Sequence, residues 1–134
     1  MQGVVGLLAV EQLDISGDLR KSLSAAVAQI VEAARPQAVV LFGSYAEGRA
    51  DPDSDLDLLV VARTNNRWRL AARLYLLWHS LRRELPGLPP ADILVYTPRQ
   101  FLGQLMVGFP AYQAARHGVI LHGHLPEPGG QVAE

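Results

Sequence analysis

The chain has 134 residues, of which 49% are hydrophobic and 19% are charged, and its formal net charge is −1. This length fits one domain, and the composition is typical of a globular protein rather than a disordered one. A charge so close to zero argues against a general nucleic-acid-binding protein. The chain contains no cysteine, which excludes disulfides, zinc–thiolate sites and thiol nucleophiles and fits a cytoplasmic protein.

The first half of the chain predicts one helix and two strands. An apolar run at residues 4–10 is far shorter than the roughly 20 residues of a membrane span, so we expect it to pack or to contact a partner. After a capping segment at 16–18, apolar residues recur at three- and four-residue steps until Pro36, which predicts an amphipathic helix. Short apolar runs at 38–42 and 56–61 predict two buried strands.

The second half predicts three helices and two strands: helix 66–85, strand 91–96, helix 98–106, helix 110–116 and strand 119–121. This order predicts an α+β fold, in which a small mixed β-sheet has its helices packed on one face. We expect an N-terminal extension at residues 1–16, one domain at 17–122 and a flexible C-terminal tail at 123–134, where proline and glycine are frequent.

The segment between the first two predicted strands holds the most informative motif. Gly43 and Ser44 follow the first strand, where a turn can present backbone N–H groups to a phosphate. Ten residues later, Asp55 and Asp57 stand two apart at the second strand, so their carboxylates leave the same face. Two acids side by side on an apolar strand repel each other unless a cation neutralises them. The segment therefore predicts a divalent metal site that faces a nucleotide.

A third acid, Asp92, opens a later apolar strand that can lie beside the second one. The competing interpretation is that all three acids only cap turns and strand ends. Asp57 argues against it, because Asp57 is surrounded by leucines and no basic residue is near it in sequence. Three carboxylates of this kind can hold two Mg²⁺ ions together with phosphate oxygens and water. Asp92 would also be the natural general base for an attacking hydroxyl.

The same segment superficially matches a P-loop, because Gly43 and Gly48 have the right spacing. A P-loop then requires Lys followed by Ser or Thr, whereas this chain has Arg49 and Ala50. The acids and proline at residues 51–53 also prevent the helix that a P-loop needs. We therefore reject this interpretation.

The Gly-Ser turn, the ten-residue spacing, the Asp-x-Asp pair and the later acid together resemble the signature of the DNA polymerase β-like nucleotidyltransferase superfamily. The similarity is greatest to its minimal nucleotidyltransferase (MNT) group, and the element order agrees over roughly residues 17–122. The resemblance implies transfer of a nucleoside monophosphate, with AMP from ATP as the expected case, and release of pyrophosphate. It implies that Gly43 and Ser44 hold the triphosphate, that Asp55 and Asp57 bind metal, and that Asp92 completes the metal site and activates the acceptor.

One residue departs from the pattern of the group. Glu47 stands where MNT-like proteins often carry a basic residue, and Arg49 is the candidate that would compensate for it in nucleotide binding. Of the other polar groups, His122 and His124 lack a third ligand nearby and are expected to be surface residues. Helix 66–85 carries five arginines and more apolar residues than one buried face needs, which indicates either a solvated face or a surface for a partner or for self-association.

Larger members of the superfamily carry a further domain for the acceptor, so we expect another chain or a second copy of this one to complete the acceptor site. In the MNT group the usual partner is a small helical HEPN protein, and the pair resembles a toxin–antitoxin system in which the MNT chain adenylylates the toxin. Two alternatives stay open at this point. The first is a non-catalytic module that masks a partner by contact alone. The second is a nucleotidyltransferase that modifies a small molecule such as an antibiotic.

Overall fold

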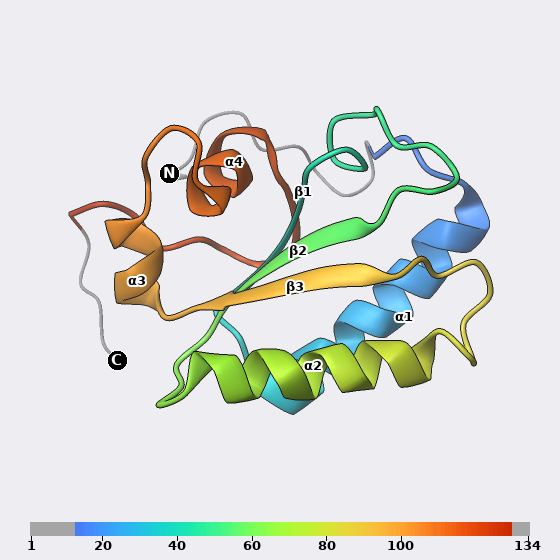
Figure 1. Ribbon diagram of the computed structural model, residues 1–134, viewed down its shortest axis with the longest axis horizontal. Coiled ribbons are helices and arrows are strands. Elements are labelled where there is room, and N and C mark those ends of the chain that lie inside the picture. Colours follow the sequence, from blue (N-terminus) through green and yellow to red (C-terminus); the bar gives the residue numbers. More distant parts are fainter. Residues whose placement is uncertain (1–12, 130–134) are drawn as a thin grey trace.

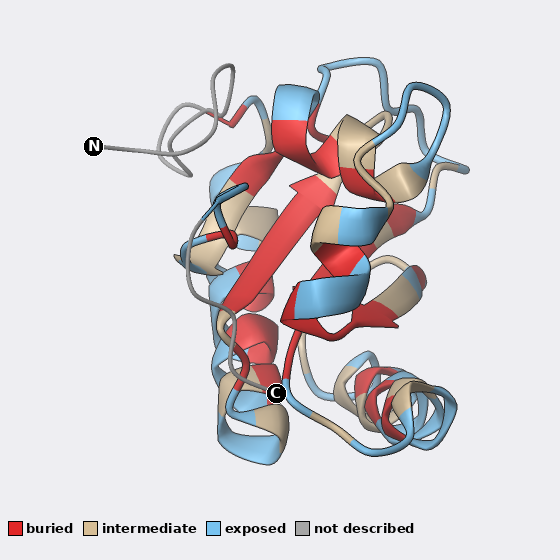
Figure 2. Ribbon diagram, turned by 90° about the vertical axis from the view of Figure 1, so that its left-hand side faces the viewer, coloured by how far each residue is buried: buried red, intermediate tan, exposed pale blue. Residues whose placement is uncertain are grey.

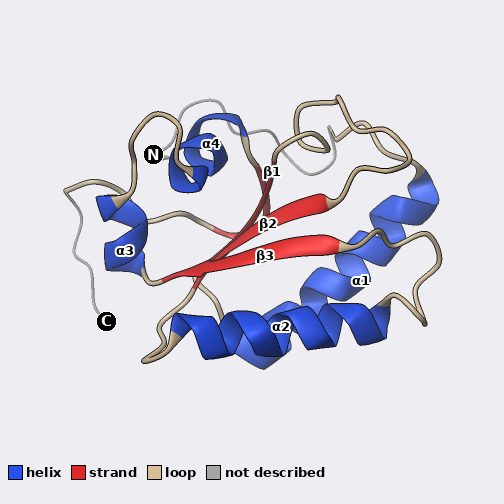
Figure 3. Ribbon diagram, viewed as in Figure 1, coloured by secondary structure: helices blue, strands red, loops and turns tan. Residues whose placement is uncertain are grey.

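The computed structural model describes residues 13–129 of the chain, so the apolar run at residues 4–10 lies outside the described part. Figure 1 shows the order of the helices and strands along the chain, and Figure 3 shows how they are distributed in space. The elements are α1 Gly17–Ala34, β1 Ala38–Phe42, β2 Leu56–Val61, α2 Arg67–Leu81, β3 Ala91–Tyr96, α3 Pro98–Gly103, α4 Pro110–His117 and β4 Val119–Gly123. This is the order that the sequence predicts.

The four strands form one mixed sheet in the order β3-β2-β1-β4. β1 is antiparallel to both β2 and β4, whereas β2 and β3 are parallel and are joined by the crossover helix α2. A parallel pair needs such a crossover, and a helix is its usual form. The predicted α+β fold with a small mixed sheet is confirmed. Its consequence for function is that β2 and β3 bring sequence-distant residues side by side at the same level of the sheet.

The expectation that all helices pack on one face of the sheet is wrong. α1 and α2 cover one face, where they pack on residues such as Val39, Leu41 and Leu58. α3 and α4 cover the opposite face, where Phe101 and Ala114 pack on the residues of β1 and β2 that point the other way. The physical reason is that β1 and β2 are apolar on both faces and both must be shielded from water. Figure 2 shows buried residues on the strands and on the helix sides that face them.

Helix α2 starts at the predicted place and ends earlier than predicted. Asn66 caps it by accepting a hydrogen bond from the backbone N–H of Arg69 at 3.0 Å. The helix ends at Leu81 rather than at residue 85, and the chain then turns back towards the sheet. The Trp78 indole donates to the Pro89 carbonyl at 2.9 Å, which ties this return segment to the helix. The start of β3, and with it Asp92, is thereby held in position.

Helix α3 is also shorter than predicted, because it ends at Gly103 rather than near residue 106. Its start agrees with the sequence: Thr97 and Gln100 form a reciprocal capping box and Pro98 occupies the first turn. In the described part of the chain, no helix combines the length and the apolar character that a membrane crossing requires.

Candidate active site

The Gly43–Ser44 turn begins directly after β1 and lies against an acid of β2. Gly43 has a φ of +78°, a conformation that glycine adopts far more readily than other residues. A Cβ at this position would overlap the Oδ2 of Asp57. The next residues form a tight turn, in which the Glu47 N–H donates to the Gly43 carbonyl at 3.1 Å and the Arg49 N–H donates to the Ser44 carbonyl at 2.9 Å. Glycine is therefore required at residue 43 both for its backbone conformation and for the close approach of the carboxylate.

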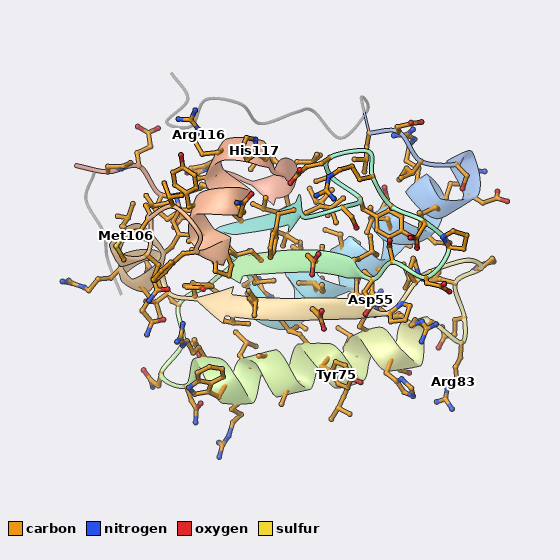
Figure 4. The ribbon with its side chains drawn as sticks, turned by 45° about the horizontal axis from the view of Figure 1, so that its top comes forward. Asp55, Tyr75, Arg83, Met106, Arg116 and His117 are labelled. Carbon is orange, nitrogen blue, oxygen red and sulfur yellow. The ribbon has the colours of Figure 1, made fainter. Side chains whose placement is uncertain are left out.

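Asp57 and Asp92 are direct neighbours in the parallel ladder between β2 and β3. Residues in register on adjacent strands point to the same face, so the two carboxylates lie side by side. Asp57 is also opposite Phe42 in the antiparallel ladder with β1, which places it next to the Gly43 turn. Asp55 is exposed and lies just before the first residue of β2, where Figure 4 labels it. The structure therefore gathers Gly43, Asp57 and Asp92 at one place.

The two acids open into a cavity of about 530 Å³. Apolar side chains form most of its wall and come from four elements: β1, α2, β3 and α4. The lining residues are Phe42, Asp57, Ala71, Ala72, Tyr75, Asp92, Ile93, Leu94 and Pro110. A cavity of this size with few convergent polar groups is the usual form of a ligand site. Its two carboxylates, Asp57 and Asp92, are acids that the sequence motif contains.

Residues 20–107, which are more than half of the chain, match the sequence model of a family described as "Nucleotidyltransferase domain". This range includes the Gly43–Ser44 turn and all three acids. The chain belongs to the nucleotidyltransferase domain family. The superfamily resemblance and the enzyme class expected from the sequence are both confirmed.

Several solved structures are similar to this nucleotidyltransferase. One is a toxin–antitoxin with AMP-PNP, with 23% sequence identity, a TM-score of 0.46, and coverage of 75% of this chain and 73% of that chain. Another is a candidate nucleotidyltransferase from Sulfolobus solfataricus, with 16% identity, a TM-score of 0.44, and coverage of 80% and 88%. A third is the tri-AMPylated Shewanella oneidensis HEPN toxin in complex with MNT antitoxin, with 22% identity, a TM-score of 0.41, and coverage of 74% and 71%. No curated protein matches the chain in sequence.

The acids of the nucleotidyltransferase fit a divalent cation in their chemistry. Burial raises the pKa of Asp57, and the charges of Asp92 and then Asp55 raise it further. None of the three acids forms an ion pair with a basic side chain among residues 13–129. Within the same residues, no three acidic or histidine side chains converge into a complete metal-binding cage. Mg²⁺ commonly uses only one or two carboxylates and takes its other ligands from substrate phosphates and water, and the neighbouring pair Asp57 and Asp92 offers that number.

Arg49, the predicted nucleotide-binding cation, is engaged elsewhere in the turn. Its guanidinium pairs with the Glu47 carboxylate at 3.2 Å, and 63% of its side-chain surface is exposed. Glu47, which departs from the MNT pattern, thus forms an ion pair with Arg49, the residue that was expected to compensate for it. Ser44 is half-buried beside Gly43 and has no side-chain hydrogen bond within the described part of the chain, so its hydroxyl is available to a ligand.

Replacing Glu47 by Gln should strengthen triphosphate binding. The substitution keeps the size of the side chain and removes the charge that holds Arg49. We expect the Kd for ATP to fall about two- to five-fold, the range that corresponds to an exposed ion pair. Isothermal titration calorimetry with ATP checks this value. An unchanged Kd would mean that Arg49 does not reach the triphosphate even when its partner is removed.

The raised pKa of Asp57 predicts how pH affects stability in the absence of divalent metal. The ordinary pKa is 3.8, and burial, Asp92 and Asp55 raise it in the folded protein. The folded state therefore holds this proton more tightly than the unfolded chain, and its stability falls as pH rises from the unfolded pKa through the folded one. As pH rises across this window, the Tm of wild type minus the Tm of Asp57→Asn should decrease. A Tm difference that stays constant with pH would contradict the raised pKa.

Some residues of the site could not be identified from motifs. Tyr75, Ala72 and Pro110 line the cavity, but no short spacing in the sequence connects them to the acids. The available signal was that helix 66–85 carries more apolar residues than one buried face needs. His122 and His124 lie at the end of β4 and after it, and no metal-binding group forms there among the described residues.

Proposed function

We propose that this nucleotidyltransferase transfers AMP from ATP to a hydroxyl group of a partner protein and uses Mg²⁺ to do so. One observation carries the proposal: Asp57 and Asp92 are in register on parallel strands, and Asp57 lies directly against the Gly43 turn. A turn that can hold phosphates and a pair of carboxylates that needs a cation are thus adjacent. A triphosphate with its metal supplies both the phosphates for the turn and the cation for the carboxylates.

In the proposed reaction, the backbone of Gly43 and the hydroxyl of Ser44 hold the triphosphate tail. Asp55, Asp57 and Asp92 hold two Mg²⁺ ions, which when bound offset the negative charge of the phosphates. Asp92 is exposed and accepts the proton of the incoming hydroxyl. The hydroxyl oxygen forms a bond to the α-phosphorus, the bond from that phosphorus to the bridging oxygen breaks, and pyrophosphate leaves.

A protein acceptor is supported by the openness of the site. Asp92 and Tyr75 are exposed, and no described segment of the chain closes over the cavity that they line. Because the sequence carries the motif of the MNT group, we take the acceptor to be a small helical HEPN-type toxin and this chain to be its antitoxin. A second copy of the chain is the other candidate to complete the site.

The test is transfer of AMP from α-labelled ATP. The full chain is co-expressed with the product of the neighbouring reading frame, purified with it, and incubated with Mg²⁺ or with a chelator. We expect label on the partner only when Mg²⁺ is present. Label on a small-molecule acceptor without a partner chain would favour the antibiotic-modifying alternative. ATP binding without transfer to any acceptor would favour the non-catalytic module, and the proposal would be wrong.

A further inference from the structure

A separate cavity lies where the chain passes from β2 into α2. It has a volume of about 320 Å³, a size at which small-ligand pockets occur, and it shares no lining residue with the cavity at the acids. Asp57 stands near the start of β2 and Arg63 follows its end, so about 20 Å of extended chain separates the two. Figure 1 shows the segment that enters α2 at the opposite end of the sheet from the loop between β1 and β2. We call this second cavity the basic cavity.

The charged residues that line the basic cavity are all arginines, namely Arg63, Arg69 and Arg73. They are exposed, and their guanidinium groups form no hydrogen bond, ion pair or ring contact with any described residue. Glu32 directly precedes a lining residue of α1, yet none of the three arginines pairs with it. Within the described part of the chain, no carboxylate therefore neutralises these arginines by direct contact.

The sequence concentrates positive charge around this cavity. Half of the chain's 12 lysine and arginine residues lie between residues 63 and 83, namely Arg63, Arg67, Arg69, Arg73, Arg82 and Arg83. No acidic residue occurs between Asp57 and Glu84, although the formal net charge of the whole chain is −1. A solvated helix face usually carries charges of both signs, whereas a concentration of one sign in a hollow raises the local concentration of counter-ions. The expected counter-ion here is an anion.

The positions of the three arginines favour an anion between them. Arg69 and Arg73 are four residues apart on α2, so they lie on the same side of the helix and repel each other. Arg63 comes from the segment before the helix. Two helix ends also border the cavity, with Asn66 at the start of α2 and Ala34 at the end of α1. Their partial charges are opposite in sign, so the arginines decide which ligands the cavity attracts.

Two polar side chains supply further hydrogen-bond donors. The Thr64 hydroxyl accepts a hydrogen bond from the Asn66 N–H at 3.1 Å, and its own hydrogen remains free to donate. The side-chain oxygen of Asn66 accepts from the Arg69 N–H at 3.0 Å, which leaves the Asn66 amide N–H groups for a ligand. Thr64 and Asn66 both line the basic cavity. The cavity thus combines three cations with neutral donors.

The geometry of a guanidinium group selects the class of anion. Each arginine can donate two parallel hydrogen bonds to a phosphate or a carboxylate. Three arginines offer more donors than the oxygens of one carboxylate or one phosphate accept in this way, and they match a diphosphate better in both oxygen atoms and charge. A nucleic-acid backbone presents its charges singly and spaced along the strand, so it fits a row of cations better than three cations at one cavity.

We infer that the basic cavity binds a ligand through a diphosphate group, which Arg63, Arg69 and Arg73 hold together with Thr64 and Asn66. Free diphosphate and the phosphate tail of a nucleotide present the same kind of group. This site is distinct from the triphosphate site proposed at the Gly43 turn, and it requires neither the acids nor a metal.

Binding of inorganic pyrophosphate tests the site. The full chain is freed of divalent metal with a chelating resin and is titrated calorimetrically at low ionic strength. We expect saturable binding to wild type and a Kd about five- to tenfold higher in each of Arg63→Gln, Arg69→Gln and Arg73→Gln. Because these side chains are exposed, the unliganded variants should keep at least the Tm of wild type.

The matched controls are Arg83→Gln and Arg116→Gln, which remove the same charge outside the basic cavity. Figure 4 shows Arg83 beyond the C-terminal end of α2 and Arg116 on α4. Both controls should bind pyrophosphate as wild type does. An equal Kd for all five variants would show attraction by bulk charge alone and overturn the inference, as would the absence of saturable binding. A loss of affinity in Arg49→Gln but in none of the cavity variants would place the anion at the Gly43 turn and also overturn it.

Titrations with ATP and with a single-stranded RNA oligonucleotide identify the source of the group. ATP that binds more tightly than pyrophosphate, with the same loss in the cavity variants, would assign the cavity to a nucleotide. Weaker binding of ATP with that pattern would assign it to free diphosphate. An oligonucleotide that binds more tightly than both, and loses affinity in Arg83→Gln as well, would reveal an extended nucleic-acid surface and overturn the inference.

Discussion

Replacing Asp57 by Asn should lower the rate of AMP transfer about 10²- to 10³-fold and leave the fold intact. The substitution preserves the shape of the side chain but removes the charge at the point where the Gly43 turn, Asp92 and the cavity meet. Loss of one precisely placed electrostatic contact at a reaction site has an effect of this size. The measurement is the single-turnover rate of transfer from labelled ATP at saturating Mg²⁺.

The matched control is Asp53→Asn, in the loop that precedes β2. Asp53 is exposed, and its backbone N–H donates to the Asp51 carboxylate at 2.9 Å, as in a turn. This variant makes the same chemical change a few residues away and should transfer AMP at the wild-type rate. Transfer by Asp57→Asn within a few-fold of wild type would show that the carboxylate is not part of the reaction site.

Gly43→Ala should impair both stability and transfer. The positive φ of residue 43 costs a non-glycine residue about 1 kcal/mol or more, and the new methyl group would overlap the Asp57 carboxylate. The carboxylate or the turn must then move. Because displacement of a reacting group by about 1 Å can cost on the order of 10²-fold in rate, we expect a loss of that order in addition to a lower Tm.

In Gly43→Ala, backbone strain and overlap with Asp57 act together, and Gly48→Ala separates them. Gly48 has a similar φ of +73°, but a Cβ there would meet no atom within 4 Å. The Tm of Gly48→Ala should therefore fall by about as much as backbone strain alone lowers the Tm of Gly43→Ala. AMP transfer by Gly48→Ala should continue at the wild-type rate. If the two variants had equal transfer rates, the contact between residue 43 and Asp57 would be irrelevant to the reaction.

Much of this site follows from local sequence. The Gly-Ser turn and the Asp-x-Asp pair lie within one segment between two apolar runs, so their proximity needs only the pairing of β1 with β2. The position of Asp92 also follows once a helix is predicted between two apolar strands, because such a crossover makes the strands parallel neighbours. The structure adds the exact register, which sets Asp92 opposite Asp57.

The remaining features depend on packing that no short pattern encodes. The strands are apolar on both faces, and the periodicity of α3 and α4 does not indicate which face each helix covers. Tyr75 is placed in the cavity wall by the rotation of α2 against β3, which many side-chain contacts determine together. The Glu47–Arg49 pair depends on the shape of the turn, which the sequence alone did not predict.

The proposal is that the Gly43–Ser44 turn, Asp57 and Asp92 form one site for a triphosphate and its metal. Its most direct test is a crystal structure of the full chain with a non-hydrolysable ATP analogue and Mn²⁺ in place of Mg²⁺. We expect an anomalous Mn²⁺ peak against the carboxylates of Asp57 and Asp92, with the triphosphate against the Gly43–Ser44 turn. A triphosphate bound away from this turn, with no Mn²⁺ at either carboxylate, would contradict it.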